Sequence, residues 1–358
     1  MKPRHDSRPL PIKLDSTSNG EFAPVPLDAV ATHARSGAAA AVETAARRLG
    51  LSRRDYLVST LGAAATLAAF DRAFAAAGRS GGRYVLPAEA PFELAAADAA
   101  IGGDDFIFDV QLHHVNPKGP WRRRASPFTF RSTPNSACSK TDHIECFSSD
   151  ALLKEVFFDS DTAMGVLSHV AGGADENPLD FEAAGAMRAA ANALDGTERL
   201  LLHGRCMPTL AGEVDGMDAQ VARFPVTALK TYTQFGPRDG AAGFFLDDDR
   251  LLWGTDSIWY GSPQDQIQAF RAFQIAEALH DRHGYPALTP ALKRKVFGLN
   301  AARVYGLQPD ALRRKLRSDG VQRRKAEYLN DPQPSFPTYG PRDRAEFLAF
   351  RRWHGELP

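Results

Sequence analysis

Two short segments constrain the fold of this chain most, because each combines the pattern of a buried strand with polar side chains. Residues 106–114 read FIFDVQLHH, and residues 251–263 read LLWGTDSIWYGSP. Side chains alternate between the two faces of a strand. One face of the first segment therefore carries Asp109, Gln111 and His113. In the second segment Asp256 stands at the carboxyl end of the apolar run, where barrel enzymes keep catalytic groups.

Composition narrows the class of protein. The 358 residues are 44% hydrophobic and 24% charged, which is enough for one sizeable core. The 43 Lys and Arg residues balance 43 Asp and Glu residues, so there is no basic excess to hold phosphates. Basic residues do gather in residues 313–325, which we interpret as a solvated helix face. We expect a small-molecule substrate and no nucleic-acid partner.

The first 78 residues have the composition of a leader. Residues 1–35 are polar and rich in Pro, without sustained periodicity, and predict disorder. Arg53 and Arg54 then precede an apolar stretch and the small-residue site Ala73-Phe74-Ala75. This arrangement resembles a twin-arginine export signal. The alternative is a surface helix with a basic start.

The signal resemblance implies export to the periplasm by the twin-arginine route, with the signal either cleaved or retained. A membrane-spanning helix needs about 20 apolar residues, and this stretch is too short. Contact with a membrane is therefore expected only through the signal. Export of this kind also implies that the protein folds before it crosses and that its destination is oxidising.

Three cysteines fit such a compartment. Cys138 and Cys146 bracket His143 in the segment ACSKTDHIEC. A local disulfide, two buried thiols and a small metal clip are all open, but the spacing matches no zinc pattern, so we favour the thiols or the disulfide. Cys206 is interpreted as a small core residue.

Strand and helix patterns alternate through the middle of the chain. The segments that predict strands are 106–113, 162–169, 199–204, 226–233 and 250–255. Helices are predicted over 180–194 and 212–223, then as one long helix after Ser262 and Pro263, and again after Thr289 and Pro290. Alternation of this kind predicts a parallel α/β sheet with βαβ crossovers.

Three features together resemble the amidohydrolase-related superfamily of metal-dependent hydrolases. They are the Asp-x-Gln-x-His strand end, the Gly254-Thr255-Asp256 segment, and a closing helix that carries Asn300, Arg303 and Tyr305. The resemblance implies a TIM-barrel-like (β/α)8 fold with one or two divalent metals at its mouth. It also implies hydrolysis of an amide, ester or related bond of a small molecule, or decarboxylation of an aromatic acid as in some relatives.

Carried over to this sequence, the resemblance makes Gln111, His113 and Asp256 metal ligands, with zinc the expected ion. Asp256 is also the expected catalytic base, because a divalent cation lowers the pKa of bound water and a carboxylate can take its proton. Gln111 stands where relatives have His, and a neutral amide oxygen is a weaker zinc ligand. His203 and Lys230 are expected to line the site, and His114 to be a packed or supporting histidine.

The connection over residues 234–249 departs from the family pattern. It is rich in Gly and Asp, shows no helical periodicity, and is short for a parallel crossover. The chain therefore predicts five strands where a closed barrel needs eight, and the barrel is expected to be incomplete or opened between about 234 and 250. An exposed strand edge would favour self-association. A catalytically inactive remnant that acts as a binding or interaction protein is the competing hypothesis.

These observations predict three regions. Residues 1–78 are expected to be a disordered leader with a twin-arginine-type signal. Residues 79–308 are expected to form the amidohydrolase-like barrel domain. Residues 309–358 are expected to form a helical extension at the carboxyl end.

Overall fold

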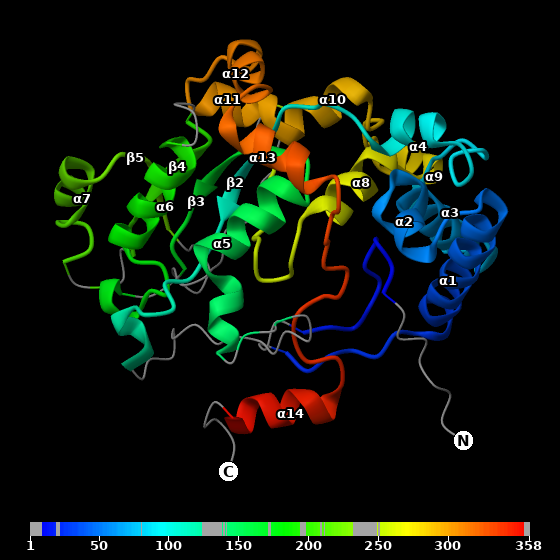
Figure 1. Ribbon diagram of the computed structural model, residues 1–358, viewed down its shortest axis with the longest axis horizontal. Helices are drawn as coiled ribbons and strands as arrows, with labels where there is room; N and C mark the ends of the chain where they lie inside the picture. Colours follow the sequence, from blue (N-terminus) through cyan, green and yellow to red (C-terminus); the bar gives the residue numbers. More distant parts are fainter. Residues whose placement is uncertain are drawn as a thin grey trace.

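A four-stranded parallel sheet lies at the centre of the protein, in the order β2-β3-β4-β5 (Figure 1). The strands are β2 (Ile107–Leu112), β3 (Thr162–Leu167), β4 (Leu200–Arg205) and β5 (Val226–Lys230). The computed structural model describes residues 9–353 apart from 19–21, 80, 124–137, 139, 141, 171–172, 194–197, 208–209, 211, 232–248 and 250. Four of the five predicted strands are thus confirmed.

The fifth predicted strand forms no regular strand of its own, but it lies beside β2. The amide of Val110 donates to the carbonyl of Trp253 at 3.0 Å, and the amide of His113 donates to the carbonyl of Ser257 at 2.7 Å. Ser257 also forms a parallel bridge with Leu112. Residues 251–257 therefore occupy the edge of β2 that β3 leaves open. The predicted residues 232–233 and 250 lie outside the described residues.

Helices cover the sheet and connect its strands. They are α5 (Ser149–Leu152), the π-helical η3 (Leu153–Phe158), α6 (Phe181–Ala193) and α7 (Met217–Arg223), with short 3-10 turns at η1 (Pro120–Arg123), η2 (His143–Phe147) and η4 (Ala174–Glu176). In contrast, α4 (Leu94–Ile101) packs away from the sheet, in an apolar cluster with residues 29–76. The helices predicted over 180–194 and 212–223 correspond to α6 and α7. The sheet buries Phe108, Met164 and Val166 completely, because helices and the carboxyl-terminal region pack on its faces.

The first 78 residues do not fit the expected disorder where the structure describes them. Residues 29–76 form α1 (Ala29–Leu49), α2 (Arg53–Val58) and α3 (Thr60–Ala76), which pack together at one end of the molecule (Figure 1). Many alanines let α1 and α3 approach closely, and the apolar run of the signal-like segment is buried there, with Leu67 fully covered. Asp28 caps α1 by accepting from the amide of Ala31 at 2.8 Å.

The segment before α1 is also ordered in part. Residues 9–18 run along the chain near residues 338–342, where the amide of Ser18 donates to the carbonyl of Pro341 at 2.8 Å. Leu10 and Ile12 are buried in the same apolar cluster as α1 and α3. Low average hydrophobicity predicted disorder here, whereas a few well-placed apolar residues anchor the segment.

The long helix predicted after Pro263 is broken into two. It appears as α8 (Gln264–Ala272) and α9 (Glu277–His283), separated by β6 (Phe273–Ile275). The break occurs because β6 pairs antiparallel with β1 (Gly82–Tyr84). Tertiary pairing overrides the local helical periodicity at this point.

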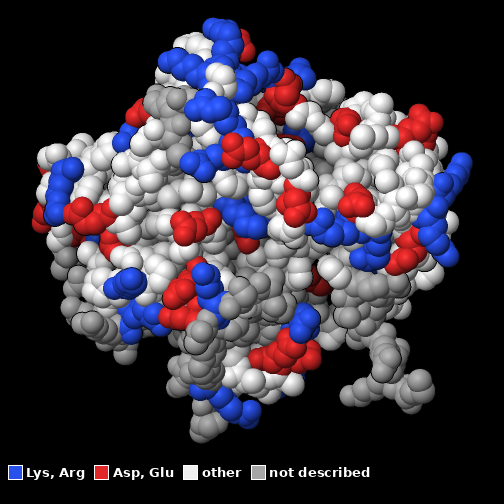
Figure 2. Space-filling model, in the orientation of Figure 1, with Lys and Arg blue, Asp and Glu red and all other residues white. Residues whose placement is uncertain are grey.

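The carboxyl-terminal region is helical. A continuous helix, predicted from Thr289 and Pro290, comprises α10 (Pro290–Arg294), the π-helical η6 (Lys295–Leu299) and α11 (Asn300–Val304). It is followed by α12 (Pro309–Leu316), α13 (Gly320–Tyr328) and α14 (Arg344–Trp353). Figure 2 shows basic side chains gathered over α12, where Arg313 and Arg317 both pair with Asp104.

No helix within the described residues is both long and apolar enough to cross a membrane.

Candidate active site

Polar side chains from all five neighbouring segments gather at one edge of the sheet. Parallel strands place their carboxyl ends on the same side, and this is where ligands bind in α/β folds. The residues that follow or end the strands there are His113 after β2, Ser168 and His169 after β3, His203 on β4, Lys230 at the end of β5, and Asp256 in the segment beside β2. The sequence predicted four of these six.

Asp256, Gln111 and His113 meet at a single carboxylate oxygen. The side-chain amide of Gln111 donates to Asp256 Oδ1 at 2.8 Å. His113 Nε2 lies 2.9 Å from the same oxygen. The His113 side chain is only 1% exposed, whereas that of Asp256 is 41% exposed. The site therefore has a buried imidazole behind a carboxylate that solvent and small molecules can reach.

The backbone brings Asp256 to this position. Its φ of 59° lies in the left-handed region, which Asp tolerates better than most residues, and its amide donates to the carbonyl of Gln111 at 3.1 Å. Just before it, the Thr255 hydroxyl and amide both donate to the carboxyl group of Asp109. Asp109 is fully buried, so this contact fastens the 251–257 segment to β2 from inside the sheet.

Charges around the site determine which groups hold protons. Burial alone would raise the pKa of Asp256, but His113, Gln111 and Lys230 together hold the pKa of that carboxyl below its ordinary value. Burial lowers the pKa of His113, and the Asp256 carboxylate offsets this only in part. Near neutral pH the site thus contains an ionised Asp256 beside a neutral imidazole.

Lys230 contributes a cation to the same edge. Burial lowers the pKa of Lys230 to about 8, against the opposing effect of the Asp256 carboxylate. At neutral pH most of its amines are therefore protonated. The structure thus brings Lys230 to the same edge of the sheet as Asp256.

His203 is held as a neutral group. Its Nδ1 lies 2.8 Å from the Ser168 hydroxyl and its Nε2 lies 2.6 Å from the Tyr305 hydroxyl. Burial, together with the charge of the nearby Lys230, lowers the pKa of His203 to about 4. With both ring nitrogens engaged, His203 supports the site more readily than it reacts.

The sequence led to a prediction for only one of two further histidines near the site. His114 was expected to be packed, and it is 2% exposed with its pKa lowered by burial to about 4. His169 was not singled out. Its Nδ1–H donates to the carbonyl of Leu179 at 2.8 Å, and burial lowers the pKa of His169 to about 4. The available signal was its place at the end of the predicted 162–169 strand.

A divalent metal does not fit the predicted ligands as they lie. His113 offers a ring nitrogen and Asp256 a carboxylate, but Gln111 turns its amide nitrogen, rather than its oxygen, toward Asp256. Within the described ranges, no group of three or more His, Cys, Asp or Glu side chains is arranged to hold a metal ion. A zinc site would need ligands from beyond these residues.

The cysteines settle one prediction. Cys138 and Cys146 form a disulfide, with their Cα atoms 5.9 Å apart, so the metal clip is replaced by a covalent link. Cys206 is a free thiol of intermediate exposure.

Comparison with known proteins identifies one similarity. A family model described as Amidohydrolase matches residues 221–307, which is less than half of the chain. Asp256, Lys230 and Tyr305 lie inside this stretch, and Gln111 and His113 lie outside it. No curated protein and no solved structure matches the chain.

The match supports the resemblance to the amidohydrolase superfamily over this part of the chain, and with it a hydrolase-type function in general. The mixed α/β architecture and the parallel sheet agree with a TIM-barrel-like fold. In the part of the chain that the structure describes, however, the sheet does not close into a barrel.

Proposed function

We propose that this protein is a hydrolase of the amidohydrolase type that acts on an amide, ester or related bond of a small molecule. The observation that carries the proposal is the meeting of His113, Gln111 and Asp256 at one carboxylate oxygen. A partly exposed, ionised carboxylate at the carboxyl ends of parallel strands is suited to take a proton from an attacking water. Decarboxylation of an aromatic acid is the related activity that the same arrangement would allow.

Each group of the site has a role in this reaction. Asp256 accepts the proton of water, while Gln111 fixes the orientation of its carboxylate by donating to Oδ1. The neutral His113 ring borders the same oxygen and can receive the proton next. The Lys230 ammonium group stabilises the negative charge that develops on the carbonyl oxygen of the substrate.

Zinc remains part of this proposal only through ligands outside the described residues. The family is usually metal-dependent, yet the side chains within the described ranges do not make a metal site. The roles given above therefore belong to the chain's own residues.

Replacing Asp256 by Asn tests the proposal. Turnover of a panel of small amides and esters should fall by about 10² to 10⁴, because Asn cannot accept the proton. Asn keeps the shape of the side chain and its tolerance of a left-handed backbone, so the unfolding midpoint should change little. Equal turnover by the variant would contradict the role of Asp256.

The competing candidate is an inactive remnant that acts as a binding or interaction protein. It is favoured by the strand arrangement: residues 251–257 lie beside β2, as the last strand of a barrel lies beside the first, while β5 is the far edge of the sheet. We propose that three strands are missing between β5 and residue 251, with the loss near residues 234–250.

Resequencing of the codons for residues 246–250 tests this loss. A longer reading frame would show that the short connection is an artefact of the sequence and would favour the enzyme. An unchanged frame, together with no turnover by the wild-type protein on the substrate panel, would favour the remnant.

A further inference from the structure

The imidazole of His113 is stacked on an indole ring. The ring centroids of His113 and Trp259 lie 5.3 Å apart, and the planes are inclined by 23°. Trp259 is only three residues beyond Asp256, so one short loop carries both neighbours of the His113 ring. Trp259 covers one face of the His113 ring. At the edge of the same ring, Nε2 lies 2.9 Å from Asp256 Oδ1. The position of the imidazole therefore depends on the position of Trp259.

Phe147 supports Trp259. The two ring centroids are 5.9 Å apart, and Phe147 is 1% exposed. The carbonyl of Phe147 also accepts from the amide of Val115 at 2.7 Å, two residues beyond His113. Phe147 thus contacts the site in two ways, through the Trp259 ring and through the backbone that carries His113.

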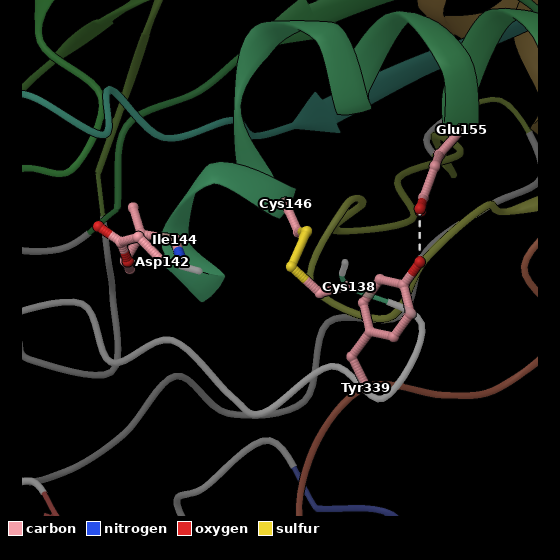
Figure 3. Close-up of a disulfide and its surroundings, with 6 residues drawn as sticks. All are labelled: Cys138, Asp142, Ile144, Cys146, Glu155 and Tyr339. Atoms are coloured by element: carbon pink, nitrogen blue, oxygen red, sulfur yellow. Dashed lines mark hydrogen bonds between the residues drawn. A yellow bond between two sulfur atoms is a disulfide. The ribbon is translucent and has the colours of Figure 1, made fainter. Parts of the chain in front are cut away.

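Phe147 is the last residue of η2, and a disulfide holds this turn. Asp142 caps its start by accepting from the amide of Ile144 at 3.1 Å, and Cys146, next to Phe147, is bonded to Cys138 (Figure 3). Tyr339 packs edge-on against Phe147 with centroids 6.0 Å apart. Its hydroxyl is fixed 2.5 Å from Glu155 Oε1 (Figure 3).

We propose that Trp259 is a positioning residue for His113, and that the Cys138–Cys146 disulfide keeps it in place through Phe147. The inference deepens the proposed function and rests on it for the role of His113. Contacts continue without a break from the disulfide through Phe147 and Trp259 to the imidazole. Opening the disulfide frees Cys146, so η2 loses one of its restraints and Phe147 confines the indole less firmly.

This arrangement makes the site sensitive to redox conditions. A dithiol reductant donates two electrons and two protons to the disulfide, which becomes two thiols while the dithiol closes to its own cyclic disulfide. The reverse reaction requires a disulfide-bearing oxidant that accepts the two electrons. The site is therefore complete only in the oxidised chain, in keeping with the oxidising compartment that the signal-like segment implies.

Proton NMR of the His113 ring gives a direct readout. An indole stacked on an imidazole shifts the ring protons of the imidazole upfield, so this shift reports the position of the Trp259 ring over His113. His113→Gln identifies the signals. In the oxidised full-length protein they should lie upfield, and they should move downfield when a dithiol is added. The Cys138→Ser/Cys146→Ser variant should show the moved position without reductant.

Three further variants separate positioning from general stability. Trp259→Leu should lose the upfield shift, whereas Trp259→Phe should keep part of it. Phe147→Leu leaves the disulfide intact and should still move the His113 signals. Cys206→Ser is the matched control, because it removes the free thiol and should respond to the dithiol as the wild-type protein does.

Turnover distinguishes this inference from the proposed function. On reduction kcat should fall by about tenfold with KM nearly unchanged, because a displaced imidazole harms the reaction more than binding. If the His113 signals move on reduction but no form of the protein has turnover, the positioning of His113 by Trp259 and Phe147 is supported and the hydrolase proposal fails. If the His113 signals do not change on reduction or in Phe147→Leu, the inference is overturned, whatever the turnover.

Discussion

Asp109 and Asp256 are two carboxyl groups close to one another that the fold treats in opposite ways. Asp256 is partly exposed and surrounded by donors, and its pKa is lowered. Asp109 is fully buried, and burial raises its pKa to about 7 even though Thr255 and the amide of Gln111 donate to it. The Asp256 carboxylate is thus available for chemistry, and Asp109 fixes the position of the segment that carries Asp256.

The raised pKa of Asp109 predicts a pH dependence of stability. Between about pH 4 and pH 7 the folded protein retains a proton on Asp109 that the unfolded chain has lost. The free energy of unfolding should therefore fall as the pH rises through this window, by up to about 1.4 kcal/mol per pH unit from this group. Asp109→Asn removes this titrating group. The free energy of unfolding of the variant, measured in urea, should therefore increase relative to that of the wild-type protein as the pH rises. A difference that stays constant with pH would contradict this assignment.

The lowered pKa of Lys230 predicts an alkaline limit to activity. If its ammonium group stabilises the developing negative charge, kcat should decrease as the pH rises through about 8. Lys230→Met should be slower at neutral pH and should lack this limb. Lys293 is a matched control, because burial also lowers its pKa to about 8. Its amine donates to the carbonyls of Arg271 in α8 and Phe273 in β6, so its titration should not produce the alkaline limb. An alkaline limb that persists in Lys230→Met would exclude the role.

Sequence could predict the residues of the site better than their contacts. Strand alternation placed Gln111 and His113 on one face of the first strand, and only the family resemblance added Asp256 to them. Neither could show that Gln111 would present its nitrogen to Asp256, because that depends on which partner is available in three dimensions. The stacking of Trp259 on His113 was equally hidden, since an aromatic residue in such a segment more often belongs to a core.

At the scale of elements, the helix α10–η6–α11 packs closely on β2. A Cβ atom on Gly298 would lie 2.0 Å from the carbonyl oxygen of Phe106, which is backbone and has little freedom to move. Gly298→Ala should therefore destabilise the protein by about 1–3 kcal/mol. A Cβ atom on Gly185 in α6 would meet nothing within 4 Å, so Gly185→Ala should be neutral or stabilise by about 0.5–1 kcal/mol. Urea unfolding of both variants checks the contrast, and equal effects would refute the close packing.

The elements that sequence predicted poorly are those that distant contacts decide. Four strands and the helices α6 and α7 follow local patterns, so they were predicted with errors mainly at their ends. The helix broken at β6 required knowledge of β1, which lies far away in the chain. The order of residues 9–18 likewise depends on residues 338–342.

For the whole molecule, the amino-terminal helices raise a question about export. The apolar run expected to act as a signal is the buried helix α3, Arg53 pairs with Glu43 at 3.0 Å, and Arg54 pairs with Asp331 at 3.3 Å. We propose that the segment acts as a twin-arginine signal before these contacts form, and that it is retained in the folded protein where it is not cleaved.

Charge-preserving substitutions test this proposal. Arg53→Lys/Arg54→Lys should leave the protein in the cytoplasm, because the twin-arginine route distinguishes Arg from Lys. Arg47→Lys/Arg48→Lys changes an adjacent pair at the end of α1 and should not alter the location. Cell fractionation with immunodetection measures both. The same distribution for the two double variants would exclude a twin-arginine signal.

The sheet as a whole contains five neighbouring segments of a barrel-like arrangement, and the position of residues 251–257 beside β2 is what brings Asp256 to His113. Four of the five predicted strands form the described sheet and the fifth lies beside β2 without being a regular strand, whereas the pair β1 and β6 was not predicted. The position of the last segment could not be derived from local pattern alone, since it rests on backbone hydrogen bonds to β2.

The most direct test of the account is the pH titration of the His113 ring by NMR in the wild-type protein and in Asp256→Asn. Burial lowers the pKa of His113 and the Asp256 carboxylate opposes this effect, so removing the charge of Asp256 should lower that pKa further. This result would establish that the two groups meet, without knowledge of the substrate. An unchanged His113 titration in Asp256→Asn would show that the carboxylate and the imidazole do not form one site, and the account would fail.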